Sequence, residues 1–276
     1  AAADSRDLAL GDAWTREDEV DGKTAATAFR RIGRSADGRW VHYEATLSHG
    51  RRHQVRRHAA LAGVPLLGDD EHGGPAAPRL ALHCREVRWP GLAAPLAAPL
   101  PAYFTAVLDG DGDPALAACL DRRGAWPRAV GDAWRAVHRD EIPGLPAAID
   151  IYGTRYNAVW FDEEADPAPL AAVLDELVAR LGLVGGVVRV HRRNPHQRGL
   201  KEEVAVRGDV PETFAVTEHG LTYAINLRST QHTGLFPDQR DTRRRVARIA
   251  AGRRVGNLFA FTCSFSVAAV AAGAEV

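Results

Sequence analysis

The sequence predicts an α+β protein whose final stretch changes to the α/β class. Short runs in which apolar and polar residues alternate, such as residues 40–47, are typical of half-buried strands, and helical patterns separate them. A proline-spaced stretch, residues 90–101, can form neither a regular helix nor a central strand, so it divides the chain. Residues 255–276 then predict a strand, a tight turn, a small-residue helix and the first residues of a second strand. That order is how an α/β unit begins.

Composition sets the broad class of protein. A chain of 276 residues with 46% hydrophobic content can bury the cores of two ordinary domains. No window approaches the roughly 18 apolar residues of a membrane span, and the N-terminus is acidic, which argues against an export signal. Cys84, Cys119 and Cys263 lie far apart without paired spacing. We therefore expect no metal site, no disulfide, no membrane partner and a cytoplasmic location.

Both ends of the sequence look cut. The chain contains no methionine and begins at Ala1, and the predicted second strand at the C-terminus has only just begun at Val276. We therefore expect a fragment that holds parts of its functional sites.

Arginines gather in groups although the formal net charge is zero. The planar guanidinium suits phosphate, so these groups favour a nucleic-acid partner. A coding bias that fills solvated helix faces with arginine explains them equally well, and charge alone does not decide. The groups are Arg51, Arg52, Arg56 and Arg57; Arg189, Arg192, Arg193, Arg198, Lys201 and Arg207; and Arg240, Arg243, Arg244, Arg245, Arg248, Arg253 and Arg254.

The first domain is predicted to span residues 1–108. It is rich in strand patterns and contains a helix over residues 52–62, which Gly63-Val64-Pro65 ends. Glycine, aspartate and proline dominate the start of residues 109–131, which we expect to be a linker with one helical turn around residues 115–120.

The second part is predicted to hold a central α+β domain over residues 132–228 and an α/β segment over residues 229–276. A tight hairpin turn is expected at residues 218–220. Strands are expected at 147–151, 156–161, 186–192, 203–207, 214–218, 221–227 and 255–259, and helices at 167–181 and 241–251.

Two C-terminal segments form a motif together. Residues 233–240 read Thr-Gly-Leu-Phe-Pro-Asp-Gln-Arg, and residues 257–264 read Asn-Leu-Phe-Ala-Phe-Thr-Cys-Ser. They resemble the ribosomal RNA methyltransferases of the RlmI/RlmK type, in which Thr-Gly-(Leu/Phe)-Phe-x-Asp-(Gln/His)-Arg precedes Asn-(Leu/Cys)-Phe-x-Tyr-Thr-Gly. The resemblance runs from about Arg135 to the end of the chain. It implies S-adenosylmethionine as cofactor and the start of a Rossmann-like domain at residue 229.

The resemblance also implies which residues bind the cofactor. Asp238 and Arg240 would fold over its amino-acid moiety, and Phe236 and Phe261 would form apolar walls for the adenosyl group. The expected cofactor-binding residues are Asp238, Gln239, Arg240, Asn257, Phe259, Phe261, Thr262, Cys263 and Ser264. The chain departs from the family by Phe261 in place of tyrosine and Cys263 in place of glycine. The alternatives are a surface ion pair for Asp238 and Arg240 and a small packing residue for Cys263.

The central domain resembles the domain that precedes the catalytic domain in the same enzymes. Residues 149–153, Ile-Asp-Ile-Tyr-Gly, match a run of that family, and residues 189–199 correspond to its basic, RNA-facing strand and loop. Arg192 and Arg193 are therefore expected to contact RNA phosphates. The implied partner is ribosomal RNA, 23S above all. Residues 223–227 resemble the RlmK branch, which makes 7-methylguanine, but 5-methylcytosine, the product of the other branch, stays open.

The first domain resembles the C-terminal half of an RluA-type pseudouridine synthase. Three motifs carry this resemblance in order, at residues 47–58, 63–69 and 79–83. It implies that Arg56 pairs with a catalytic aspartate, while Arg51, His53 and Gln54 shape the pocket. The His-Arg-Leu-Asp segment that supplies the aspartate does not occur in the chain, so the catalytic residue stays unknown. For His53, and for His58 as well, packing on a helix face is the alternative.

The two resemblances together imply an RNA-modifying protein. It would join a partial, mixed antiparallel pseudouridine synthase domain to an RNA methyltransferase without its C-terminal half, and the fragment itself is expected to be inactive. In one alternative, the first domain is a degenerate remnant that only holds RNA. In another, the protein is a non-catalytic RNA-binding protein.

Overall fold

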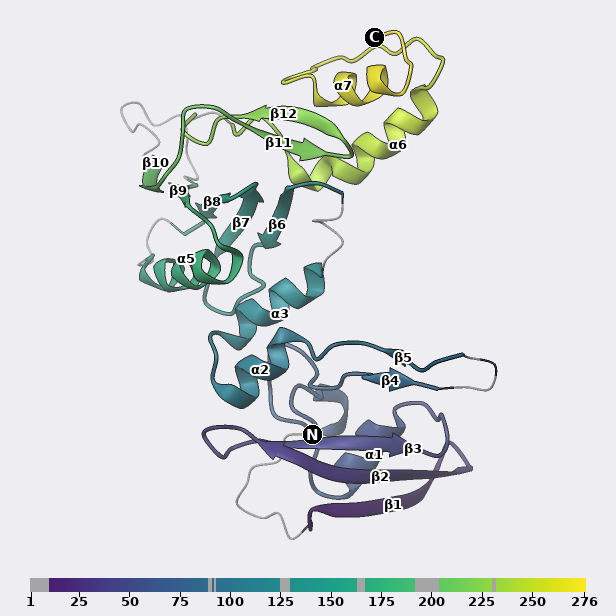
Figure 1. Ribbon diagram of the computed structural model, residues 1–276. Coiled ribbons are helices and arrows are strands. Elements are labelled where there is room, and N and C mark those ends of the chain that lie inside the picture. The colour runs from purple at the N-terminus through teal and green to yellow at the C-terminus, as the bar shows by residue number, and fades with distance from the viewer. Residues whose placement is uncertain are drawn as a thin grey trace. The chain divides into compact units, whose positions relative to one another are not determined.

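The computed structural model describes residues 10–88, 91, 93–124, 130–162, 167–191, 204–229 and 232–276. The chain divides into two compact units, unit 1 over Ala1–Asp121 and unit 2 over Arg122–Val276 (Figure 1).

Unit 1 is built on a three-stranded antiparallel sheet of β1 (Ala13–Val20), β2 (Lys23–Arg34) and β3 (Val41–Leu47), in that order. Alternating residues of these strands face a core, as their sequence pattern predicts. There Trp14 stacks on Phe29 with ring centroids 3.9 Å apart, and Tyr43 meets Phe29 edge to face. The sheet therefore buries one face through aromatic and branched side chains.

Helix α1 (Gln54–Leu61) covers this core, close to the expected range of 52–62. Its buried face carries two polar side chains whose partners lie on β2. Gln54 Nε2 donates to the Ala26 carbonyl at 2.9 Å, and His58 Nδ1 lies 2.9 Å from the Thr27 hydroxyl. His58 is fully buried, so the interpretation of this histidine as a packing residue is confirmed.

Two helices complete unit 1 and correct the predicted linker. They are α2 (Ala102–Asp109) and α3 (Pro114–Arg123), and α3 is a ten-residue helix rather than a single turn. Its residues 115–119 are all buried, because alanine, leucine and cysteine fit a close contact. The sequence contained a helix-start signal, an aspartate followed by a proline. In the structure the Asp113 carboxylate accepts from the Ala115 N–H at 2.7 Å, and Pro114 is the first residue of the helix. Among its described residues, the proline-spaced stretch contributes the short strand β5 (Leu96–Ala97), which pairs with β4 (Glu86–Val87).

Unit 2 contains a five-stranded sheet in the order β10-β9-β8-β7-β6. The strands are β6 (Ala133–Val137), β7 (Ala147–Tyr152), β8 (Arg155–Trp160), β9 (Gly185–Val190) and β10 (Val204–Gly208). Only the β8–β9 pair is parallel, and α5 (Ala168–Leu181) provides the crossover that a parallel pair requires. The predicted helix over 167–181 is therefore confirmed, and its leucines at positions 170, 174 and 177 are buried.

A hairpin and three helical segments follow the sheet. β11 (Phe214–Glu218) pairs with β12 (Leu221–Ile225) through a turn in which His219 and Gly220 have φ of 51° and 79°. Two successive positive φ values are what a two-residue hairpin loop needs, so the predicted turn is confirmed. The helices are η3 (Pro237–Gln239), α6 (Arg240–Ala250) and α7 (Ser264–Ala271), and Figure 1 shows α6 and α7 next to the hairpin.

The prediction of a strand at residues 255–259 is wrong. Arg254 and Glu275 form one isolated parallel bridge, and the Val255 N–H donates to the Glu275 carbonyl at 2.8 Å. Phe259 and Phe261 have positive φ, which interrupts an extended run. The expected order of extended segment, turn, helix and parallel extended segment is present, but the pairing extends over one bridge only.

Within the part of the chain that the structure describes, no helix combines the length and the hydropathy needed to cross a bilayer.

Candidate functional site

The loop over residues 233–235 is fixed to the central sheet by Tyr152. This tyrosine lies on β7 and is 1% exposed, and its hydroxyl donates to the Leu235 carbonyl at 2.8 Å. The Thr233 hydroxyl lies 2.9 Å from the Tyr152 hydroxyl and donates to the Leu235 carbonyl at 3.1 Å. Burial raises the pKa of Tyr152 far above its ordinary value, so the hydroxyl remains a donor. Gly234 has a φ of +103°, and a Cβ there would lie 2.7 Å from the Ala224 carbonyl, so the loop requires glycine.

The anchored loop meets the second segment of the motif. The Thr262 hydroxyl donates to the Gly234 carbonyl at 2.7 Å, and the rings of Phe236 and Phe261 lie 5.5 Å apart. His232 packs against Phe261 with centroids 4.2 Å apart. Phe236 is 45% exposed and Phe261 is 59% exposed. The two phenylalanines expected as walls for the adenosyl group are therefore neighbours, and together they present an open apolar surface.

The turn before α7 has an unusual backbone. Phe259, Phe261 and Cys263 have φ of 60°, 53° and 59°, a region that costs a residue with a side chain about 1–2 kcal/mol. Such local strain is typical of functional sites. The positive φ of Cys263 also explains why the resembling enzymes have glycine at this position. Cys263 directly precedes α7, whose free N–H groups and dipole favour an anion.

Two further predicted residues flank this turn. The Asn257 side chain donates to the Ser266 hydroxyl at 2.8 Å, and Ser264 is buried at the start of α7. Phe259, in contrast, is fully exposed. Asn257 therefore ties the turn to α7, whereas Phe259 contributes a ring that is open to solvent.

Asp238 and Arg240 separate in the structure. Asp238 is exposed and accepts from Gln239 Nε2 at 3.1 Å. Arg240 is 8% exposed and turns toward β6, where Nη1 lies 3.4 Å from the Ala133 carbonyl. Burial lowers the pKa of Arg240 below its ordinary value. The surface ion pair of Asp238 with Arg240 is therefore wrong, and only Asp238 and Gln239 of these three face outward.

Two polar residues of the run 149–153, Asp150 and Tyr152, have structural roles that the sequence did not predict. Asp150 is 6% exposed, and Arg135 donates to both of its carboxylate oxygens at 2.8 and 2.9 Å. Burial raises the pKa of Asp150, and the charge of Asp238 raises it further. Every residue of β7 is buried, so its two polar side chains had to find partners. Polar residues inside a buried strand were thus the signal for Asp150 and Tyr152.

Comparison with known proteins identifies this region. Residues 185–276 match the sequence model of the S-adenosylmethionine-dependent methyltransferases. The match covers a third of the chain, and this segment is similar to that enzyme family. The cofactor that the resemblance implied is therefore the one that the matched family uses. We call residues 185–276 the methyltransferase segment.

Individual relatives, which align with about half of the chain, agree with the match. Ribosomal RNA large subunit methyltransferase K of Neisseria meningitidis serogroup B is 38% identical over 156 residues, which are 54% of this chain and 43% of that protein. The ribosomal RNA large subunit methyltransferase of Deinococcus radiodurans is 32% identical over 155 residues, covering 52% of this chain and 36% of that protein. The chain thus spans less than half the length of either relative. The resemblance to ribosomal RNA methyltransferases is confirmed at this level.

Solved structures include a putative methyltransferase, SMU.776, in complex with SAH. It aligns with 58% of this chain and 41% of its own, at 25% identity and a TM-score of 0.47.

The arginine expected to pair with a catalytic aspartate has another partner. Arg56 donates from Nε and Nη2 to the two carboxylate oxygens of Asp69, at 3.0 and 2.5 Å. Asp69 is completely buried, and its hydrogen bonds from Arg56 lower its pKa. Asp69 belongs to the second motif of unit 1, and the Ala81 N–H of the third donates to the Leu67 carbonyl at 2.8 Å. The three motifs therefore pack together, although the pseudouridine synthase resemblance itself stays a prediction.

The other residues predicted to line a pocket or to contact RNA differ in their burial and contacts. Gln54 is turned into the core and accepts from the Arg51 N–H at 3.1 Å, so it is structural rather than a pocket residue. His53 is half-buried beside Arg56, with Nε2 3.3 Å from Arg56 Nη1. Arg192 and Arg193 lie outside the described residues. Arg189, expected in the RNA-facing strand, instead donates inward to Asn157, Leu227 and Ser229.

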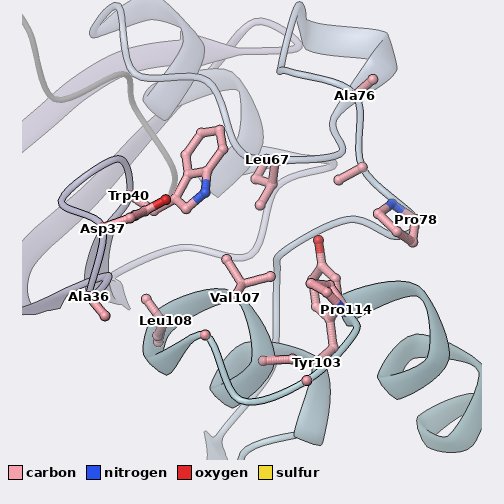
Figure 2. A pocket seen from close by; sticks show the side chains of 14 residues that line it. Ala36, Asp37, Trp40, Leu67, Ala76, Pro78, Tyr103, Val107, Leu108 and Pro114 are labelled. Carbon is pink, nitrogen blue, oxygen red and sulfur yellow. The ribbon is translucent and has the colours of Figure 1, made fainter. Parts of the chain in front are cut away.

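Unit 1 also contains a hollow of about 400 Å³ that no sequence prediction indicated. Figure 2 shows Trp40, Leu67, Pro78 and Val107 around it, with the Tyr103 hydroxyl pointing into it. That hydroxyl is buried, and among the described residues it has no hydrogen-bond partner. Burial raises the pKa of Tyr103, so the hydroxyl stays protonated. The hollow has a mainly apolar lining, into which the Tyr103 hydroxyl points as a hydrogen-bond donor.

Proposed function

We propose that this protein is an S-adenosylmethionine-dependent RNA methyltransferase. The observation that carries the proposal is the meeting of Phe236 and Phe261, 5.5 Å apart, beside the strained turn that leads into α7. An apolar surface next to the N-terminal end of a helix suits a ligand with an aromatic adenosyl group and a carboxylate. Both parts lie in the methyltransferase segment.

Large-subunit ribosomal RNA, 23S in particular, is the proposed substrate, as the names of the relatives suggest. The methyl group would pass from the sulfonium to a base by in-line displacement, so the protein's task is to position the two reactants. We propose guanine N7 as the acceptor because residues 223–227 resemble the RlmK branch. Cytosine C5 is the alternative, and it would require a thiolate nucleophile. A cytoplasmic location goes with this substrate.

For unit 1 we propose a pseudouridine-synthase-like RNA-binding role. The support is the packing of its three motifs around the Arg56–Asp69 pair. A fused synthase would isomerise uridine through an aspartate, whereas a degenerate unit would only hold RNA. The alternative for the whole protein is a non-catalytic RNA-binding protein.

Cofactor binding is tested first, by equilibrium dialysis of labelled S-adenosylmethionine against the full-length protein. We expect saturable uptake that drops about tenfold or more in a Phe261→Ala variant, because the adenosyl group loses one apolar wall. Ile249→Ala is the matched control, since Ile249 is an exposed apolar residue on α6. Absence of uptake would rule out the methyltransferase and leave the RNA-binding alternative.

The substrate is tested by methyl transfer to unmodified large-subunit ribosomal RNA, followed by digestion and mass spectrometry of the nucleosides. We expect 7-methylguanosine. The appearance of 5-methylcytidine would transfer the assignment to the other branch. Methylation of a protein or a free amino acid in its place would refute the RNA substrate, and the cofactor assignment would stand.

A further inference from the structure

Two histidines and a glutamate of unit 1 converge outside the methyltransferase segment. His53 Nδ1 lies 3.3 Å from a Glu71 carboxylate oxygen and 3.3 Å from His72 Nε2. One ligand atom from each of the three residues falls within 4.8 Å of the others. We propose that His53, Glu71 and His72 bind a divalent transition-metal ion, Zn²⁺ by preference.

The distances match the coordination sphere of zinc. Ligand atoms around a tetrahedral ion lie about 1.63 bond lengths apart, so Zn–N and Zn–O bonds of about 2.0–2.1 Å separate them by about 3.3–3.4 Å. Both measured separations from His53 Nδ1 are 3.3 Å. They exceed the usual hydrogen-bond length of about 2.9 Å. Two of the three separations therefore match those of ligands around one ion, and the third lies within 4.8 Å.

The backbone holds these ligands in place independently of an ion. His53 precedes α1 with a φ of 53°, and its side chain makes no hydrogen bond to the helix end. His72 ends a short 3-10 turn, η2 (Asp70–His72), and its own N–H donates to the Asp69 carboxylate at 3.3 Å. A Cβ at Gly74 would lie 1.9 Å from the Leu66 carbonyl, so the backbone after the turn packs too closely on Leu66 for any residue but glycine. Arg56, bound to the same Asp69, connects the turn to α1. Such support orients metal ligands.

The neighbouring charge of Arg56 does not prevent cation binding. Its Nη2 lies 3.6 Å from Glu71, but the buried Asp69 carboxylate neutralises the guanidinium through two hydrogen bonds. When His53 binds an ion through Nδ1, its proton resides on Nε2, which faces Arg56 Nη1 at 3.3 Å. Because the guanidinium is planar and is held on Asp69 through Nε and Nη2, the His53 ring must tilt so that Nε2 moves away from Nη1. The contact that is lost is the one of 3.3 Å between these two nitrogens.

The donor set selects the kind of ion. Two imidazoles and one carboxylate suit zinc and its neighbours in the first transition row, while magnesium and calcium prefer oxygen ligands alone. Three protein ligands leave a fourth tetrahedral position for water or an oxygen of a bound molecule. The Glu71 side chain is 64% exposed, so an ion can reach this ligand from solvent.

The test is calorimetric titration of the untagged, metal-stripped protein with zinc chloride, after Cys84 and Cys263 have been replaced by serine to remove the exposed thiols. We expect one ion per chain at micromolar affinity or tighter. His72→Ala should weaken binding by about 100-fold and Glu71→Gln by about 10-fold. His49→Ala, which removes an exposed histidine of the same unit, should leave the affinity unchanged.

A second measurement uses Co²⁺ as a spectroscopic probe. Intense visible absorption, typical of a tetrahedral site, should appear on titration and vanish in His72→Ala. Should His72→Ala fail to fold, the exposed Glu71→Gln serves in both measurements. Absence of zinc binding, or the same affinity in both variants as in the parent protein, would overturn the proposal. Its failure would leave the proposed methyltransferase intact, because no residue of that segment takes part.

Discussion

Substituting Glu218 by glutamine tests the most deeply buried ion pair of unit 2. Arg243 donates to the two carboxylate oxygens of Glu218 at 2.7 and 2.6 Å, and the two side chains are 1% and 2% exposed. A third hydrogen bond runs from Arg243 to the Phe236 carbonyl at 3.0 Å. The pair thus connects β11 to α6 and to the loop that carries Phe236.

The expected loss of stability follows from this burial. Glu218→Gln keeps the shape of the side chain but leaves the cation of Arg243 without a counter-charge. Removing one partner of a buried pair costs about 3–5 kcal/mol, a large part of the roughly 5–15 kcal/mol that stabilises a domain. Replacing both residues, by Glu218→Leu with Arg243→Met, should restore most of the loss, because no charge is then buried. The Phe236 carbonyl loses its donor, so the restoration stays incomplete.

The assay is hydrogen exchange under increasing urea, with peptides read out by mass spectrometry. Peptides of β11 and α6 report unit 2, and a peptide of α1 serves as the internal reference from unit 1. The matched control is Asp209→Asn, which removes the partner of Arg155 from a pair in which Asp209 is 71% exposed. That change should cost below about 1 kcal/mol. If Glu218→Gln lowers the free energy of unfolding of unit 2 by no more than Asp209→Asn does, the inference that the buried pair stabilises this unit is refuted.

Three further predictions concern single residues. Tyr152→Phe leaves the buried Leu235 carbonyl with the Thr233 hydroxyl, at 3.1 Å, as its donor, so unit 2 should lose about 0.5–1.5 kcal/mol in urea unfolding and S-adenosylmethionine should bind more weakly; unchanged binding would mean that the loop needs no anchor. Cys263→Gly relieves a positive φ and should stabilise unit 2 by about 0.5–1 kcal/mol, whereas a lower thermal midpoint would show that the cysteine packs usefully. Burial lowers the pKa of His58, so the folded chain binds its proton less readily than the unfolded chain does. Unit 1 should therefore be stable above the ordinary histidine pKa of about 6.5 and weaken as the pH falls below it, and His58→Gln should flatten this dependence in urea titrations at pH values of about 7.5 and 5.5.

Local patterns predicted some elements well and others badly. The hairpin of β11 and β12 and the long helix α5 follow from turn residues and helical spacing, which act within a few residues. Helix α3 was underestimated because the glycines and aspartates before it outweighed the small apolar residues that it buries. The strand at 255–259 failed for the opposite reason. Its apolar run is suited to a strand, but three positive φ values bend the chain instead.

The candidate site was predicted in part. The motif resemblance placed Phe236 and Phe261 at one cofactor, and the structure makes them neighbours. It did not foresee that Arg240 turns into the protein or that Gln54 joins the core of unit 1. Both are polar residues whose direction depends on a strand far away in the sequence, β6 for Arg240 and β2 for Gln54.

The sequence by itself determined the kind of elements, their order and the two methyltransferase motifs, because periodicity, turn residues and short motifs are properties of neighbouring residues. Only the tertiary structure decided which side chains meet. The Tyr152 anchor, the Arg56–Asp69 pair and the grouping of His53 with Glu71 and His72 join separate segments of the chain. Such contacts depend on how strands and helices pack, and packing is set by the whole buried surface of each unit.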